Sequence, residues 1–166
     1  MSRALSAGRT LRDQLQVTHP IDMEVVAEKC GLKLLYLDLP DQIHEIQYRS
    51  GIGVNRNMDD LWIRWGIAHG VGHKVLHPAL RIQFRATHDQ LCKSYEYEAE
   101  DFAYGLLVPS TDDCRELGLL TRAAIAKYAG VPEHIARLGY PEETGPSRPE
   151  ESDGYWMYEV GWGTKE

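Results

Sequence analysis

The chain has 166 residues, a length that predicts one domain with a single hydrophobic core. Apolar residues make up 43% of the chain and charged residues 26%, and this ordinary balance excludes a wholly disordered or collagen-like protein. The formal net charge is -7, with no basic stripe along the chain, which argues against binding to nucleic acid through phosphate contacts.

Cysteine spacing and apolar run length indicate the compartment. The three cysteines are widely spaced and form no Cys-x-x-Cys pair, so neither a disulfide framework nor a thiolate zinc site is favoured. Arginines interrupt every apolar run in residues 1–18, which leaves no signal-peptide core. No stretch approaches the ~20 apolar residues needed to cross a bilayer. We therefore expect a cytoplasmic protein without a membrane partner.

The N-terminal elements can be taken in chain order. Residues 1–20 are expected to form an N-terminal helix or extension, followed by a domain at 21–140. The segment 21–30 predicts a short helix, because Asp22 can cap its start and Gly31 can end it. Leu- and Tyr-rich residues 32–39, the alternating residues 43–48 and the short segment 51–55 then predict three strands.

Two longer helices follow the strands. The first is predicted at 61–77, because capping residues precede it and apolar residues recur at helical spacing up to Pro78. Residues 79–91 have no clear period and predict a loop or short irregular helix. The second long helix covers 95–107 and is stopped by Pro109.

The C-terminal part has three features. Ser110 and Asp113 indicate the cap of a further helical turn. Segments 121–128 and 132–138, joined through Gly130, predict a helix, a turn and a second helix. Residues 141–166 are an acidic linker rich in Pro, Glu, Ser and Gly, followed by an aromatic tail.

The helix-turn-helix pattern at 121–138 is poorly equipped to recognise DNA. Its second helix offers only His134 and Arg137 as polar donors, whereas base recognition normally uses several such side chains. We therefore expect this region to pack against the two long helices.

His69 and His73 are the strongest chemical signal. Side chains four residues apart share one face of a helix and can share a metal ion, and imidazole suits zinc. Taken alone, the pair also fits two half-buried structural histidines. His77 lies roughly 12 Å from His69 along the helix axis, too far to bind the same ion.

A zinc site with one open position needs a third ligand, and a carboxylate on the second long helix is the natural candidate. Glu96, Glu98 and Glu100 are available there. Glu96 and Glu100 share a helix face, so one can bind the metal while the other orients a histidine ring.

Two segments resemble one known family. Residues 64–77, which contain His69-Gly-Val-Gly-His73, and residues 96–109, which begin at Glu96, resemble the ImmA/IrrE family of zinc metallopeptidase-like proteins. The resemblance runs from about residue 21 to residue 140 and includes Asn55 at the end of the last strand. It implies an α+β, zincin-like minimal metallopeptidase fold, in which a small twisted sheet packs against metal-bearing helices with a helical C-terminal cap.

The resemblance also implies a site and a partner. The zinc ligands would be His69, His73 and Glu96, with Glu100 behind them where the family often has Asn or Asp. Better-studied members are cytoplasmic proteases that inactivate helix-turn-helix repressors, often on mobile elements such as phages or in stress responses. We therefore expect a protein partner, such as a transcriptional repressor.

One position departs from the family pattern. The family signature is His-Glu-x-x-His, and its Glu moves a proton between the zinc-bound water and the leaving amine, but this chain has Gly70 there. Loss of a general base typically costs about 10²- to 10⁴-fold in rate. We therefore expect weak or absent peptidase activity. Close packing explains Gly72 in this family but does not explain Gly70.

Three explanations for Gly70 compete. A substitute acid or base can come from the strand region, with Glu45 as the leading candidate and His44 behind it. The protein can instead be a pseudoenzyme that keeps its metal for structure or partner binding, which we rank first. The third explanation is that an inactivating replacement of the native Glu is present in this sequence. If the geometry of the site is intact, Gly70→Glu should raise peptidase activity on a repressor-type substrate. Two rival functions lack a metal: a protein-interaction module that uses the acidic and aromatic tail, and a DNA-binding regulator.

Overall fold

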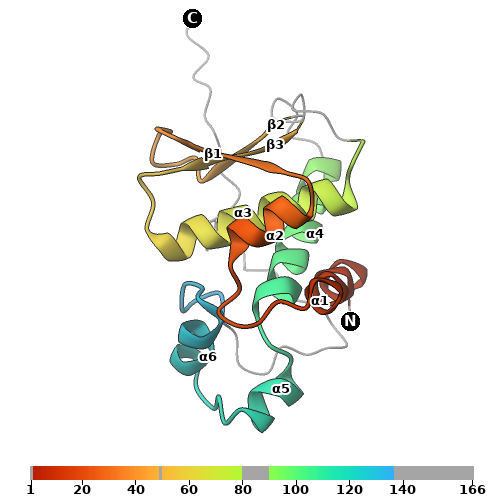
Figure 1. Ribbon diagram of the computed structural model, residues 1–166, viewed down its shortest axis with the longest axis vertical. Coiled ribbons are helices and arrows are strands. Elements are labelled where there is room, and N and C mark those ends of the chain that lie inside the picture. Colours follow the sequence, from red (N-terminus) through yellow and green to blue (C-terminus); the bar gives the residue numbers. More distant parts are fainter. Residues whose placement is uncertain (1, 49, 80–89, 137–166) are drawn as a thin grey trace, which may run out of the picture.

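The computed structural model describes residues 2–48, 50–79 and 90–136. Within these ranges the chain forms six helices and three strands, so the fold is α+β and consistent with a small zincin-like domain (Figure 1). The predicted acidic and aromatic tail, and most of the predicted loop at 79–91, lie outside the described residues. No helix in the described ranges has an apolar stretch long enough to cross a lipid bilayer.

The sheet has three strands, close to the predicted segments. They are β1 (Lys33–Leu37), β2 (Glu45–Tyr48) and β3 (Gly51–Asn55), in the order β1-β3-β2. β3 pairs with β1 in parallel and with β2 in antiparallel orientation. Every residue of the central β3 is buried, whereas β1 and β2 form the edges.

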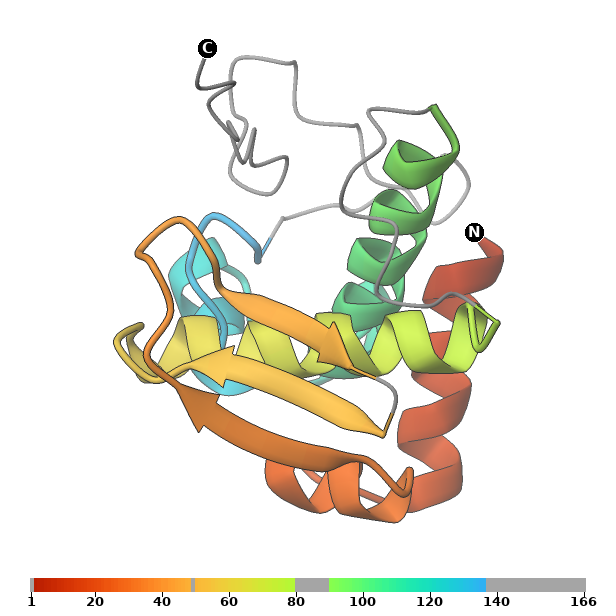
Figure 2. The ribbon, with the colours of Figure 1, turned by 90° about the horizontal axis from the view of Figure 1, so that it is seen from above.

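Two helices cover one face of this sheet (Figures 1 and 2). They are α2 (Met23–Lys29), capped by Asp22, and α3 (Asp60–Leu76), capped by Asp59. Each cap side chain accepts hydrogen bonds from backbone N–H groups in the first turn. The helices therefore begin directly after their caps, at Met23 and Asp60, close to the predicted starts at residues 21 and 61. α2 is followed by Gly31 in the left-handed region, as predicted.

Beyond α3 lie two more helices, α4 (Gln90–Leu107) and α1 (Arg3–Leu15) (Figure 1). α1 and α4 approach so closely that a Cβ added at Gly8 or Gly105 would collide with the backbone of the opposite helix. α1 therefore belongs to the same core as α4. The predicted division of the chain at residue 20 stays a prediction.

Asn55 connects the end of β3 to the chain around it. Its side chain is fully buried and donates hydrogen bonds to the carbonyls of Leu39, Pro40 and Ile43. The backbone N–H of Asn57 donates a hydrogen bond to the side-chain oxygen of Asn55. These bonds hold the loop that leads into β2 against the start of α3, so β2 has a defined position over that helix.

The helical C-terminal cap is formed by α5 (Thr111–Glu116) and α6 (Arg122–Ala129). α5 starts with the predicted reciprocal hydrogen bonds between Ser110 and Asp113. α6 ends at Gly130, where the Arg64 guanidinium from α3 donates to the carbonyls of Ala129 and Gly130. α6 is thereby attached to α3, as expected for a packing role.

The predicted helix at 132–138 is wrong for its described part. Residues 132–136 form turns, in which Ile135 and Ala136 donate backbone hydrogen bonds to residues three positions earlier. Val131, Ile135 and Ala136 are buried, so the turns direct apolar side chains into the core. A recognition helix is therefore absent from the described residues of this segment.

Candidate metal centre

The histidine pair lies between the sheet and α4. His69 and His73 are on one face of α3, with ring centroids 4.6 Å apart and side chains that are only 4% and 12% exposed. Gly72 makes this burial possible, because the carbonyl of Ala99 would lie 3.1 Å from any Cβ at that position. The close packing expected at Gly72 is therefore present, and it brings α4 next to the pair.

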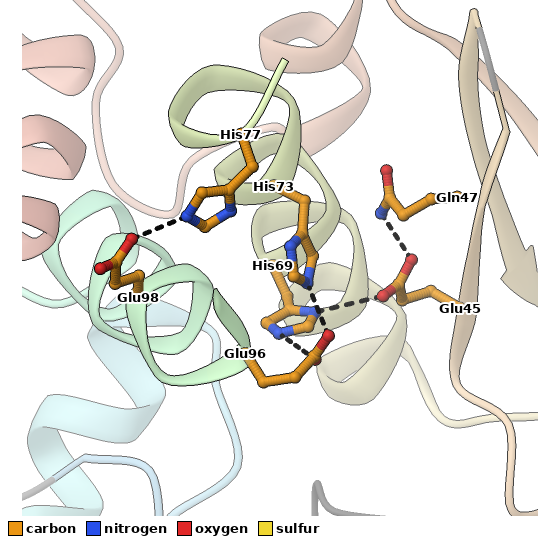
Figure 3. Close-up of polar contacts among 7 residues, drawn as sticks. All are labelled: Glu45, Gln47, His69, His73, His77, Glu96 and Glu98. Atoms are coloured by element: carbon orange, nitrogen blue, oxygen red, sulfur yellow. Dashed lines mark hydrogen bonds and ion pairs between the residues drawn. The ribbon is translucent and has the colours of Figure 1, made fainter. Parts of the chain in front are cut away.

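Glu96 faces both histidines from α4. One carboxylate oxygen lies 3.4 Å from Nε2 of His69, and the other lies 3.3 Å from Nε2 of His73. Figure 3 shows the two rings directed toward this carboxylate. Because 43% of the Glu96 side chain is exposed, this side of the pair is accessible to water.

A second carboxylate reaches the pair from the sheet. Glu45 Oε1 lies 3.2 Å from Nδ1 of His69, and Gln47 Nε2 donates to Glu45 Oε2 at 2.7 Å (Figure 3). Donor atoms of Glu45, His69 and His73 all lie within 4.8 Å of one another, so these three residues can also hold a metal ion. Two carboxylates thus compete as the third ligand.

Gly70 is packed against β2 and β3. A Cβ at this position would lie 2.7 Å from Gln47 Nε2 and 2.8 Å from Ile52 Cδ1. Both distances are shorter than ordinary van der Waals contacts, so these side chains occupy the space that a residue at position 70 would need. Close contacts are therefore present at Gly70, but the nearest atoms are the ends of flexible side chains rather than backbone, and the expectation that packing does not explain Gly70 stays a prediction.

Electrostatic interactions couple the histidines to the carboxylates. Burial lowers the pKa of His69, but hydrogen bonds and charges from Glu45 and Glu96 raise it well above its usual value. Burial raises the pKa of Glu96, yet hydrogen bonds from His69 and His73 bring it well below the usual range. Glu96 is therefore ionised at neutral pH and favours positive charge beside it.

His77, the C-cap residue of α3, contacts Glu98 and Tyr95 as well as His73, whose ring centroid lies 5.7 Å from its own. His77 Nε2 lies 2.7 Å from Glu98 Oε2, and its ring lies 4.5 Å from the ring of Tyr95. In Figure 3, His77 and Glu98 lie on the opposite side of the histidine pair from Glu45. That His77 lies too far from His69 to bind the same ion stays a prediction, and the carboxylate that His77 contacts is Glu98.

The remaining candidates are less directly connected to the pair. The buried ring of His44 contacts Trp62 edge-on, with centroids 5.0 Å apart. Glu100 is partly buried one turn after Glu96 on α4, and its predicted role in orienting a histidine stays a prediction.

Sequence reasoning missed Gln47. The signal for it was the alternation along 43–48, which places Glu45 and Gln47 on the same face of β2. What the alternation could not show is that this face covers α3 at Gly70.

Comparison with known proteins places the chain in a family. A search of curated proteins found no match. A family model described as the IrrE N-terminal-like domain, from a peptidase family, matches residues 27–138. The match covers β1 to β3, α3, α4, α5 and α6, and therefore both blocks on which the resemblance rested. The chain belongs to the IrrE N-terminal-like peptidase family.

Proposed function

We propose that this protein binds zinc through His69, His73 and Glu96 and acts on or binds a protein partner, such as a helix-turn-helix repressor, in the cytoplasm. Its peptidase activity is weak or absent, because position 70 lacks the carboxylate that the family signature has there. The observation that carries this proposal is the convergence of Glu96 with both Nε2 atoms.

The spacing of these donor atoms supports zinc. A tetrahedral zinc ion with bonds of ~2.0–2.1 Å keeps its ligand atoms roughly 3.3 Å apart. One carboxylate oxygen of Glu96 lies 3.4 Å from Nε2 of His69 and the other lies 3.3 Å from Nε2 of His73, so each nitrogen is near this spacing from a different oxygen. Two imidazoles and a carboxylate are also a ligand set common at catalytic zinc.

Exposure favours Glu96 over Glu45 as the third ligand. A hydrolytic metal needs an open position that water and substrate can reach. The Glu96 side chain is 43% exposed, whereas the side chain of Glu45, on β2, is 12% exposed. An ion on the Glu96 side would therefore be accessible, and one on the Glu45 side would be enclosed.

Position 70 determines the level of activity. Zinc, when bound, lowers the pKa of a water molecule and polarises a peptide carbonyl. His69, His73 and Glu96 would hold the ion, but none of them can transfer a proton while it is a ligand. Gly70 has no side chain, so the ~10²- to 10⁴-fold contribution of a general base is missing.

A second candidate function is an active peptidase that uses Glu45. The observation in its favour is a buried carboxylate 3.2 Å from a ligand histidine. However, Glu45 contacts His69 with one oxygen and Gln47 with the other. A carboxylate engaged at both oxygens is better suited to holding a ring than to exchanging protons with a substrate, so we rank this function second.

Metal analysis and a cleavage assay test the proposal together. Protein purified without chelating resin should contain about one zinc per chain by inductively coupled plasma mass spectrometry. Incubated with a panel of helix-turn-helix repressors, it should retain a partner in pull-down while cleaving it slowly or not at all. Absence of zinc would refute the proposal. Rapid cleavage that disappears in Glu45→Gln while zinc stays bound would support the second candidate instead.

A further inference from the structure

His69 is contacted by a carboxylate at each ring nitrogen. Glu96 lies 3.4 Å from Nε2, and Glu45 lies 3.2 Å from Nδ1. A neutral imidazole has one nitrogen lone pair for a metal, and its other nitrogen carries a hydrogen. If Nε2 binds zinc, Nδ1–H is left as a donor, and Glu45 is in position to accept from it (Figure 3).

Glu45 is held in place by its strand neighbour. Gln47 Nε2 donates to the second carboxylate oxygen at 2.7 Å, and the Glu45 side chain is 12% exposed. Both residues are on β2, whose antiparallel pairing with β3 places Glu45 opposite Val54 and Gln47 opposite Ile52. The carboxylate therefore has a defined position set by the sheet.

Gly70 is what allows Gln47 to lie there. Any Cβ at position 70 would come within 2.7 Å of Gln47 Nε2. A larger side chain on α3 would push Gln47 away and take the second hydrogen bond from Glu45. The glycine and the Glu45–Gln47 pair thus form one packing unit across the interface of helix and sheet.

We propose that Glu45 is a positioning residue of the metal centre: held by Gln47 in the space beside Gly70, it accepts a hydrogen bond from Nδ1–H of His69 and directs Nε2 toward His73 and Glu96. This inference rests on the proposed zinc site and assigns Glu45 a place outside the ligand set. Loss of such a partner to a ligating histidine typically weakens metal binding 10- to 100-fold.

The first measurement needs only the wild-type protein. In ¹⁵N-labelled protein loaded with ¹¹³Cd²⁺, the metal should couple to Nε2 of His69, while Nδ1 should carry a proton. Coupling to Nδ1 would place the ion on the Glu45 side and overturn the inference, although a metal site would still exist.

The second measurement compares zinc affinity by competition with a chelator. Glu45→Ala should bind zinc 10- to 100-fold more weakly than wild type. Glu45→Gln, which keeps an acceptor oxygen, should recover part of the loss. Glu98→Ala is the matched control, because it also removes a carboxylate that contacts a histidine, in this case His77. Its zinc affinity should stay within about twofold of wild type.

The outcomes separate this inference from the proposed function. Wild-type affinity in a folded Glu45→Ala protein, checked by circular dichroism, would refute the positioning role and leave zinc binding intact. Failure of the wild-type protein to bind zinc or cadmium would refute both. If Glu45→Ala does not fold, the cadmium coupling in wild-type protein still decides the question.

Discussion

Two side chains of the sheet lie close to Gly70. Gln47 and Ile52 extend from the sheet into the space where its Cβ would be, whereas a Cβ at Gly66, one turn earlier on α3, would make only ordinary contacts at 3.7 Å. The two glycines therefore differ in their surroundings although they occupy the same helix. A Cβ at position 70, unlike one at position 66, would require side chains of the sheet to shift.

This difference predicts opposite effects of alanine. Gly66→Ala should stabilise the protein by up to about 1 kcal/mol, because alanine is the better helix former. Gly70→Ala should destabilise it by about 1–2 kcal/mol, because overpacking exceeds that gain. Urea denaturation measures both, and equal stabilisation by the two substitutions would show that Gln47 and Ile52 move aside without cost.

The same contact bears on restoring the family signature. Gly70→Glu alone should bring little peptidase activity, because its side chain must displace Gln47. With zinc in excess, Gly70→Glu combined with Gln47→Ala should cleave a repressor substrate at least tenfold faster than the single variant. Equal rates for the two variants would mean that Gln47 does not obstruct position 70.

His19 predicts a pH dependence of stability. Burial and the charges of Arg12 and Arg64, opposed by Asp113, lower the pKa of His19 from 6.5 to about 4. Below pH ~6.5 the unfolded chain therefore binds more protons than the folded chain. The contribution of His19 to the free energy of unfolding is fully present above pH ~6.5 and is lost as the pH falls toward ~4. The loss should be about 1–2 kcal/mol, because the side chain is only partly buried.

Comparison with a non-titrating variant isolates this effect. The free energy of unfolding of His19→Gln, measured in urea at about pH 7 and about pH 4.5, should fall less than that of the wild type. Parallel losses in both proteins would show that His19 titrates normally when folded.

At the level of elements, α1 and α4 pack so closely that glycine is needed where they meet. A Cβ at Gly8 would meet the carbonyl of Phe102, and one at Gly105 would meet the carbonyl of Leu5. Leu5 and Phe102 are themselves fully buried. The family match starts at residue 27, yet α1 contributes to the same core as the matched region.

Gly105→Ala is accordingly expected to destabilise the protein by about 2–4 kcal/mol, because backbone atoms of α1 cannot move as side-chain ends can. The measurement is thermal or urea denaturation beside Gly66→Ala, a helical glycine with space around it. Wild-type stability of Gly105→Ala would mean that α1 is not packed against α4 in solution.

At the level of the whole molecule, the proposed centre joins parts that are distant in sequence. His69 and His73 come from α3, Glu96 from α4, and Glu45 from β2. The unfolded chain does not hold these groups together, so an ion that binds them favours the folded state. Metal binding should therefore raise the stability of the entire domain.

Zinc in about 100-fold excess over its dissociation constant should add about 2.7 kcal/mol, or roughly 5–10 °C in Tm. His73→Ala should lose both the metal and this increase in Tm. His77→Ala removes the next histidine on the same face and should keep the zinc-dependent increase, although its own stability differs. An unchanged increase in His73→Ala would show that His73 is not a ligand.

Features that depend only on residues adjacent in the sequence could be predicted from the sequence by itself. The caps at Asp22, Asp59 and Ser110, and the ends at Gly31 and Gly130, are local signals, and the elements begin and end close to them. The alignment of His69 with His73 is equally local, because it follows from the period of the helix. The prediction for 132–138 failed in its described part because burial of apolar side chains, rather than helix propensity, determines the backbone there.

The tertiary structure alone decided which distant groups meet. Glu45 and His69 are 24 positions apart, and no local pattern indicates that a carboxylate of β2 faces Nδ1 of that ring. The close contacts at Gly70 are likewise visible only when the sheet is packed on α3, with Gln47 and Ile52 above it. A sequence records helix and strand periods, but the contact between two faces depends on their orientation, which only the packed core determines.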